Sequence, residues 1–172
     1  MKLPFLTGVE RRFGDDEFVV SKTDLKGRIT YGNDVFMRVA GYSERELIGK
    51  PHSIIRHPAM PRCVFKLMWD TIQKHSEAFF YLLNRAKNGD HYWVFAHVTP
   101  EYDGTRNLIG FHSSRRAAEK RALSIIGPIY GTLFAEEDRH ANCKEGLEAS
   151  MEMLCGMIDK RGGDYARFVL GL

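Results

Sequence analysis

The sequence of 172 residues predicts an α+β fold: a five-stranded antiparallel sheet, helices inserted after the second strand, and a helical extension at the C-terminus. Three observations predict this class. Short β-prone runs occupy two separate stretches, before residue 32 and between residues 78 and 113. The segment between them combines helix-capping residues with prolines. From residue 117 onwards, apolar residues recur with the spacing of amphipathic helices.

The first two strands are predicted at Phe18–Ser21 and Arg28–Tyr31. Both runs contain the β-branched and aromatic residues that favour strands. Between them lies Asp24-Leu25-Lys26-Gly27, and a glycine at this place can adopt the positive φ angle of a tight turn. The pattern predicts a β-hairpin.

Two short helices are predicted next. Asn33 can cap the first helix, and Gly41 can end it. Apolar residues such as Phe36 lie on one face and stabilise this helix. Ser43 and Glu46 have the spacing of a capping box at the start of the second.

The segment Pro51–Pro61 contains three prolines and therefore predicts an irregular loop. Pro61 suits the first turn of a helix. A half-buried helix is predicted after it, because apolar residues follow at intervals of three and four. These residues are Val64, Phe65, Met68, Trp69 and Ile72.

Three more strands are predicted at Ala78–Arg85, His91–Pro100 and Leu108–Ser113. The first two are joined by Lys87-Asn88-Gly89-Asp90, and Asn-Gly is a strong signal for a tight hairpin. These strands complete the predicted sheet of five.

The chain is thereby divided into an N-terminal cap (1–16), a sheet domain (17–116) and a helical linker with C-terminal helices (117–172). In the last part, Ala117–Ala135 is predicted as a helix broken at Gly127-Pro128, and Asn142–Arg161 as a clearer helix. Asp164 can cap a final helical turn.

Composition places the chain among ordinary globular proteins, with 44% apolar residues, 12% aromatic residues and a net charge of +3. So small a charge argues against nucleic acid as a partner. The longest uncharged stretch, Ala122–Ala135, is shorter than the roughly 20 apolar residues of a membrane helix, so no membrane insertion is expected. An odd number of scattered cysteines suits reduced thiols and predicts a cytoplasmic protein.

Four motif segments resemble a known family. They are Thr23–Asp34, Gly41–Gly49, Pro51–Pro61 and Lys87–Val94. Together they are similar to the FAD-binding PAS domains of the aerotaxis receptor (Aer) and CetB energy-taxis type, over about Ser21 to Arg116. The resemblance implies a PAS fold, a non-covalently bound FAD, and a sensory domain that reports redox state or oxygen to a chemoreceptor or HAMP-type signalling protein. No catalytic residue set accompanies these motifs, so an enzyme is not expected.

A flavin requires flat apolar walls for its ring and positive charge for its phosphates. Phe65 and Trp69 lie four residues apart on one helix face and can flank a ring, although ordinary core packing explains them equally well. Arg56 and His57 lie in the irregular loop and can form charge-assisted hydrogen bonds with phosphate oxygens, the alternative being a solvated loop.

The resemblance implies three further contacts. Asn84 stands where related light-sensing flavin PAS domains bind the polar edge of the flavin, and an amide both donates and accepts. His112 replaces a glutamine of those relatives; a surface or core histidine is the other interpretation. Asn33 corresponds to an asparagine implicated in flavin binding, although helix capping alone explains it. No metal site is expected.

The sequence departs from the aerotaxis-receptor pattern at three positions: Ala59 replaces an acidic residue, Ala78 a tryptophan and Phe80 a glycine. These replacements predict a reshaped cavity that Phe80 partly fills. Two alternatives to FAD therefore stay open. One is a ligand-free interaction module closed by Phe79 and Phe80. The other is a haem gas sensor with an axial ligand from His52, His57, His75 or His112.

The C-terminal helix predicted at Asn142–Arg161 carries an apolar stripe. Its members are Leu147, Met151, Leu154 and Ile158. This stripe is expected to pack on the sheet of its own chain, where strand alternation places Trp93 and Phe95 on the outer face. Docking on a receptor or on a second copy, as a homodimer, is the alternative. No output segment is recognisable, so the signal is expected to pass to another protein.

Overall fold

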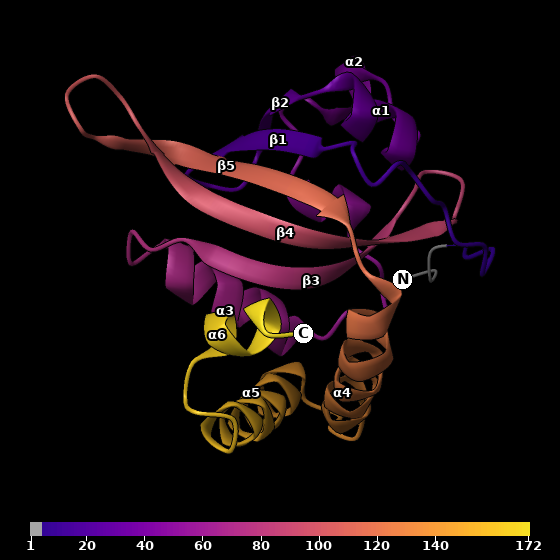
Figure 1. Cartoon of the computed structure of the whole chain (residues 1–172), viewed down its shortest axis with the longest axis vertical. Helices are drawn as coiled ribbons and strands as arrows, with labels where there is room; N and C mark the ends of the chain where they lie inside the picture. Colours follow the sequence, from indigo (N-terminus) through magenta and orange to yellow (C-terminus); the bar gives the residue numbers. More distant parts are fainter. Residues whose placement is uncertain (1–4) are drawn as a thin grey trace.

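The computed structural model describes residues 5–172 and contains one antiparallel sheet with strand order β2-β1-β5-β4-β3 (Figure 1). The strands are β1 (Val19–Asp24), β2 (Ile29–Gly32), β3 (Ala78–Arg85), β4 (His91–Tyr102) and β5 (Leu108–Ala117). The helices are α1 (Asp34–Ala40), α2 (Glu44–Leu47), the 3-10 turn η1 (His52–Ile55), α3 (Arg62–Ile72), α4 (Lys120–Asp138), α5 (Cys143–Asp159) and α6 (Tyr165–Leu170). The predicted α+β class and the five-stranded sheet are confirmed.

The structure contains the predicted helix caps and the predicted end of the first helix. Asn33 Oδ1 accepts a hydrogen bond from the Phe36 amide at 2.9 Å and caps α1. Gly41 ends that helix with φ at +72°. Ser43 and Glu46 form the capping box of α2.

Strands β4 and β5 are longer than predicted and form an extended hairpin (Figure 1). Pro100 does not end β4 because β3 pairs with β4 only as far as Val98, so the proline has a neighbouring strand on one side alone. Asp103 stabilises the hairpin turn, where its Oδ1 accepts from the amides of Thr105 at 2.8 Å and Asn107 at 2.9 Å.

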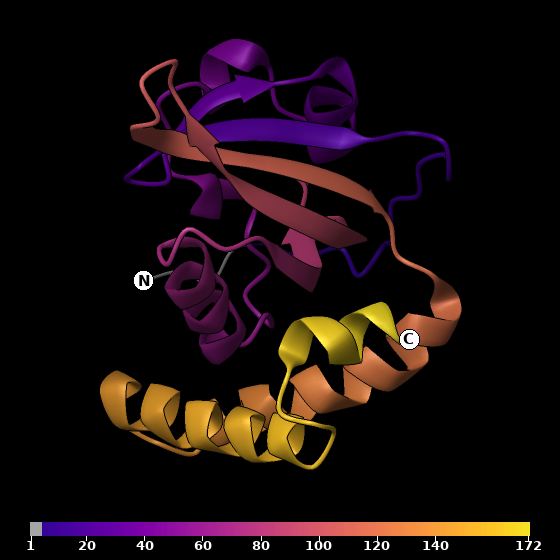
Figure 2. The same cartoon turned by 60° about the vertical axis from the view of Figure 1, so that its left-hand side comes forward.

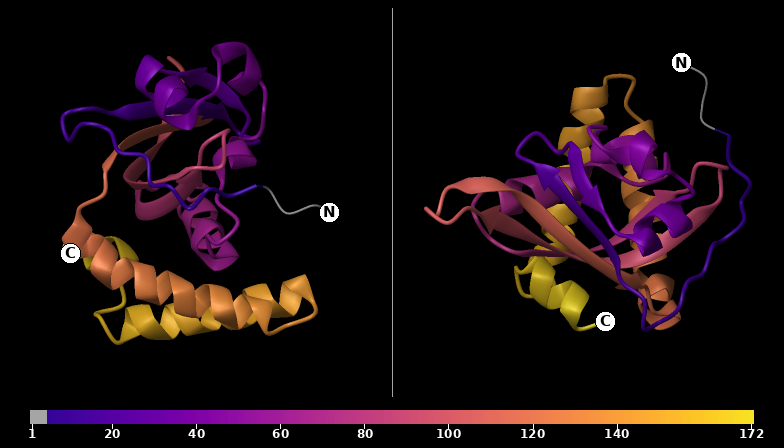
Figure 3. Two further views of the ribbon diagram at one scale, coloured as in Figure 1. Left: turned by 90° about the vertical axis from the view of Figure 1, so that its right-hand side faces the viewer. Right: turned by 90° about the horizontal axis from the view of Figure 1, so that it is seen from above.

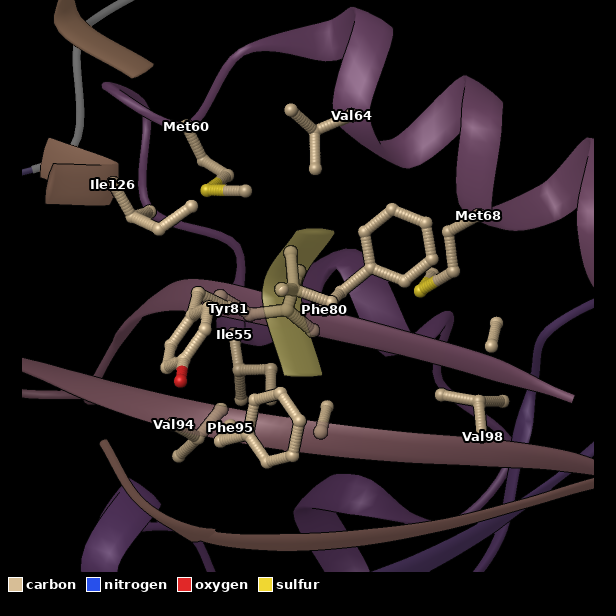
Figure 4. Packing of buried hydrophobic residues seen from close by; sticks show 14 of the residues in the cluster. Ile55, Met60, Val64, Met68, Phe80, Tyr81, Val94, Phe95, Val98 and Ile126 are labelled. Carbon is tan, nitrogen blue, oxygen red and sulfur yellow. The ribbon is translucent and has the colours of Figure 1, made fainter. Parts of the chain in front are cut away.

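The core fills the space between the inner face of the sheet and the helices. Figure 4 shows Phe80 of β3 near Val64 and Met68 of α3 and Met60 of the preceding loop, all of them buried. Cys63 at the start of α3 is fully buried, as a helix residue of this pattern should be.

Helix α4 is continuous from Lys120 to Asp138, so the predicted break at Gly127-Pro128 is wrong. Pro128 is exposed on the solvent side of the helix. The Ser124 carbonyl, which lacks a donor because Pro128 has no N–H, can therefore accept a hydrogen bond from water, and the helix continues.

The C-terminal helices form a unit below the sheet domain in Figures 1 and 2, where α4 and α5 run as a hairpin and α6 lies between that hairpin and β3. Helix α5 packs mainly on α4 and α3, so the expectation that its stripe packs on the sheet is wrong. The face that is fully buried is also rotated from the predicted stripe. It consists of Gly146, Ser150, Leu154 and Ile158, with Leu147 and Met151 partly buried beside it.

Close approach of α5 to α4 explains the rotation. A Cβ atom on Gly146 would lie only 2.5 Å from the Glu137 carbonyl oxygen, so the glycine allows contact that no larger residue permits. The outer face of the sheet is reached by α4 instead, through the Tyr130 ring 6.1 Å from that of Trp93. The Tyr130 hydroxyl donates to the Tyr81 carbonyl of β3 at 2.8 Å.

Both edges of the sheet are covered by other parts of the chain. On β3, the Leu83 amide lies 3.5 Å from Met60 Sδ, and Asn84 forms an isolated β-bridge with Arg56. On β2, the Ile29 amide donates to the Lys50 carbonyl at 2.9 Å.

The N-terminal segment runs beside the β3–β4 turn (Figure 3). The Thr7 amide donates to the Gly89 carbonyl at 3.0 Å, and Arg11 Nε donates to Asp90 at 2.9 Å. These contacts fix the described part of the predicted cap; residues 1–4 of the cap lie outside the described residues.

Candidate ligand-binding cavity

A cavity of about 430 Å³ lies between the inner face of the sheet, the η1 loop and α3. This volume falls in the range of roughly 300–1,000 Å³ that is usual for small-molecule sites. Its apolar walls include Phe65, Met68 and Trp69 of α3 and Leu82, Val98 and Phe111 of the sheet. Leu147 of α5 also contributes, so the C-terminal extension takes part in the site.

The cavity is strongly basic. Its lining includes Lys26, Arg56, Arg62, Lys66 and Arg115, and no aspartate or glutamate. Among the described residues, Arg62 and Lys66 have carboxylate partners outside the lining, whereas the other three cations form no ion pair. Uncompensated positive charge in a partly desolvated cavity favours an anionic ligand.

Asn84 supplies the most specific polar group of the cavity. It lies on the inner face of β3 and is only 3% exposed. Within residues 5–172, its Nδ2 atom has no hydrogen-bond partner. Because a buried amide without a partner costs free energy, this N–H₂ group is suited to an acceptor that a ligand provides.

Arg115 of β5 is 1% exposed and lines the same cavity. Its Nη2 donates to Ser21 Oγ at 2.6 Å, its Nε donates to the Val19 carbonyl at 3.2 Å, and its guanidinium lies 4.7 Å from the centre of the Phe36 ring. Burial lowers the pKa of Arg115 to about 10. The guanidinium is therefore charged at neutral pH in a place where it lacks a carboxylate.

His52 of η1 lies beside this group. Burial, and secondly the charge of Arg115, lower the pKa of His52 to about 3, so the imidazole is neutral at pH 7. Its Nε2 lies 3.1 Å from Ser21 Oγ. Because Arg115 already donates to that oxygen, the Ser21 hydroxyl is free to donate to Nε2, which places the histidine proton on Nδ1.

Four residues predicted from the sequence line the cavity: Arg56, Phe65, Trp69 and Asn84. The Arg56 guanidinium stacks 4.2 Å from the centre of the Phe65 ring, and its Nη2 donates to the Met60 carbonyl at 3.3 Å. Burial lowers the pKa of Arg56, which nevertheless carries its charge at the cavity.

The other three predicted residues lie elsewhere. His57 Nδ1 accepts from the Ala59 amide at 3.1 Å, outside the lining. Asn33 caps α1 and is also outside the lining.

His112 points to the outer face of the sheet, because side chains alternate along β5 and its neighbours Phe111 and Ser113 face the cavity. His112 therefore does not line the cavity, and its implied contact with a flavin has no support from the lining. Of the four histidines considered as haem ligands, only His52 lines the cavity.

Phe80 does not fill the cavity, contrary to expectation. Its ring stacks on that of Tyr165 in α6 with the centres 4.6 Å apart, and neither Phe80 nor Ala78 belongs to the lining. Phe80 packs against α6, and the cavity is not filled by its side chain.

Sequence reasoning missed Arg115, and it named His52 only as a candidate haem ligand. Side-chain alternation places Arg115 on the same face of β5 as Phe111 and Ser113, which could have indicated a cavity residue. The strand was predicted to end at Ser113, however, so Arg115 lay outside it. The signal for His52 was weaker, since it lies in a proline-bounded loop.

The family model that describes the PAS fold matches residues 29–114. The chain belongs to the PAS family. It is 39% identical over 132 residues to the aerotaxis receptor of Escherichia coli, a match that covers 77% of this chain and 26% of the receptor. A nitrogen fixation regulatory protein of Klebsiella pneumoniae is 31% identical over 96 residues, or 56% of this chain and 19% of that protein. The chain thus spans about a quarter or less of these two relatives.

Solved structures share the PAS fold at low sequence identity. A light-oxygen-voltage domain studied with a flavin analogue superposes with a TM-score of 0.57 at 18% identity and covers 64% of this chain and 83% of that domain. The light-state structure of the Aureochrome1 LOV photoreceptor gives 0.55 at 19% identity, covering 73% and 93%. The PAS fold expected from the sequence is confirmed. Within residues 5–172, no helix has both the length and the apolarity to cross a membrane.

Proposed function

We propose that this PAS domain binds a flavin nucleotide, FAD, without a covalent bond and reports redox state or oxygen to a chemoreceptor-type signalling protein. The observation that carries the proposal is the unpartnered Asn84 amide inside a cavity lined by five cations and no carboxylate. A flavin nucleotide matches this chemistry, because its ring edge offers hydrogen-bond acceptors and its phosphates carry negative charge.

The residues present fit such a ligand. Phe65 and Trp69 provide aromatic surface, and Asn84 provides donors for a carbonyl-bearing edge. Arg56 and Lys66 provide charge for phosphate oxygens. A bound flavin would supply reversible electron transfer, which is the chemistry that a redox sensor requires.

Arg115, Ser21 and His52 are the groups of this chain that would respond to a change of charge in the cavity. The Arg115 cation is buried without a counter-ion, so additional negative charge nearby would be stabilised. His52 holds its proton on the nitrogen remote from Ser21 and can rearrange its hydrogen bonds. A change of one hydrogen bond is worth about 1 kcal/mol, which is enough to bias a two-state element.

The 39% identity to the aerotaxis receptor supports the proposed partner class, a chemoreceptor or HAMP-type protein, and a cytoplasmic site of action. A homodimer is a further possibility for the assembled sensor.

Purified protein, reconstituted with FAD, tests the proposal. We expect flavin absorption bands that bleach with dithionite and return in air. Asn84→Leu should weaken FAD binding about 5- to 150-fold, the scale of a buried hydrogen bond of about 1–3 kcal/mol. His112→Ala, on the outer face, is the matched control and should bind normally. A Soret band would replace the proposal by the haem sensor, and a protein that takes up no chromophore would favour the ligand-free module.

A further inference from the structure

The start of α3 is held by the C-terminal helices through one buried carboxylate. Glu137 of α4 is 6% exposed. It accepts hydrogen bonds from Arg62 Nε at 2.9 Å, from the Cys63 amide at 2.9 Å and from Ser150 Oγ of α5 at 3.0 Å. One side chain thus joins α3, α4 and α5.

The charge of Glu137 is maintained in this position. Burial by itself would raise the pKa of Glu137, but hydrogen bonds led by that from Arg62 outweigh burial and lower the pKa. The carboxylate is therefore ionised at neutral pH and its contacts with α3 are charge-assisted.

Arg62 contributes both to the contact with α4 and to the cavity wall. It pairs with Glu137 and it also lines the cavity. Glu137 accepts from the Nε–H group, and Nη2 lies beside Gly146 of α5, where a Cβ atom would be 3.3 Å from it. Leu147, one residue after the Gly146 contact between α4 and α5, lines the same cavity.

We propose that the α4–α5 hairpin is the output element of this sensor, and that an anionic group of the bound ligand holds it in the docked position through Arg62. This inference rests on the proposed flavin nucleotide. An anionic group of the ligand would contact the Arg62 guanidinium from the cavity while its Nε–H stays bonded to Glu137, and Leu147 of α5 would contact the ligand as well. Ligand binding and hairpin docking therefore stabilise each other, and by linkage each changes the other by the same factor.

Hydrogen exchange of the full chain tests the coupling. With saturating FAD, amides of residues 143–170 should exchange at least about 5-fold more slowly than without ligand, the lower end of common coupling energies. Riboflavin, which carries no phosphate, should protect the cavity strands but leave residues 143–170 unchanged. Ligand binding is measured separately by absorbance and fluorescence quenching.

Two variants isolate the role of Arg62. Arg62→Met should abolish the FAD-dependent protection of α5 and α6 even when FAD is saturating. Lys66→Met is the matched control, because Lys66 lines the same cavity but pairs with Asp70 on its own helix. It should weaken FAD binding and keep the protection at saturation.

The coupling is refuted if FAD saturates the protein and exchange of residues 143–170 does not change, or if riboflavin protects them as well as FAD does. It is also refuted if Arg62→Met behaves like Lys66→Met. Failure to bind any flavin would be seen directly in the absorbance titration and would overturn the proposed function together with this inference, whereas the other outcomes leave the proposed function intact.

Discussion

Replacing Arg115 by methionine should separate ligand affinity from stability. Arg115 is a buried cation without a carboxylate partner, and methionine has similar length without charge. In a typical core position, loss of a large buried side chain costs about 2–5 kcal/mol. Here we expect the free energy of unfolding to change by no more than about 1 kcal/mol, because the charge itself is unfavourable.

The magnitude follows from the environment of the guanidinium. Lowering the pKa of Arg115 from its ordinary value to about 10 corresponds to roughly 3 kcal/mol against the charged form, at about 1.4 kcal/mol for each pH unit. Methionine removes that cost. It also removes the hydrogen bonds to Ser21 and Val19, worth about 1 kcal/mol each, and the contact with the Phe36 ring, worth about 0.5–1 kcal/mol. The opposing contributions nearly cancel.

Ligand binding should respond differently. If Arg115 contacts an electron-rich part of the ligand, its loss should weaken FAD binding by about 1.5–3 kcal/mol, or roughly 10- to 150-fold. Urea denaturation and FAD titration measure the two quantities on the same sample. Arg116→Met is the matched control, because Arg116 is the next residue and its guanidinium lies on the outer face over Phe95. A variant Arg115→Met that loses several kcal/mol of stability while binding FAD normally would refute the reasoning.

Three other changes probe the structure around the cavity. Gly27→Ala should lower the free energy of unfolding, measured by urea denaturation, more than Gly49→Ala does. Both glycines have positive φ, which costs an alanine about 1–2 kcal/mol, but at Gly27 the new Cβ would also lie 3.0 Å from the Trp69 ring. Equal losses in the two variants would contradict this prediction. Tyr130→Phe should lower the free energy of unfolding by about 1–2 kcal/mol in thermal melts, because the Tyr130 hydroxyl forms hydrogen bonds with the Tyr81 carbonyl of β3 and the Tyr165 hydroxyl of α6. An unchanged melting midpoint would show that these hydrogen bonds contribute nothing. Since the pKa of Glu137 is lowered in the folded state, its stabilising contribution is complete above the ordinary value of 4.5 and is lost as pH falls through the folded pKa. The protection factors of α5 amides, taken relative to the intrinsic exchange rate at each pH, should therefore fall in acid, and Glu137→Gln should remove that dependence.

The local signals in the sequence predicted much of the fold. Capping at Asn33 and Ser43, the glycine turns and the Asn-Gly hairpin depend on a few neighbouring residues, and the structure contains each of them. The helix break at Pro128 was predicted incorrectly, because its effect depends on solvent exposure and the sequence does not state which side of α4 faces water.

The cavity was predicted only in part, because its composition depends on which face of each strand is turned inward. Asn84 was implied by the resemblance to light-sensing flavin PAS domains, and the structure adds that it is buried and that its Nδ2 atom has no partner among the described residues. His112, implied by the same resemblance, lies outside the lining, since strand alternation alone does not say which face of a strand is turned inward. Leu147 enters the site from another helix, a tertiary contact that no local pattern indicates.

The covered edges of the sheet have a consequence for how this chain associates with others. An open edge strand invites a strand from another molecule to extend the sheet, which is one route to domain swapping and fibres. Here Met60, Tyr130 and the Arg56 bridge engage the backbone of β3, and the segment at Lys50 engages β2. At these points a strand from another molecule would have to displace contacts that the chain makes with itself. Among the described residues, positions 99–102 of β4 pair with β5 on one side only, so this part of the β4–β5 hairpin is an edge at which another strand can be added.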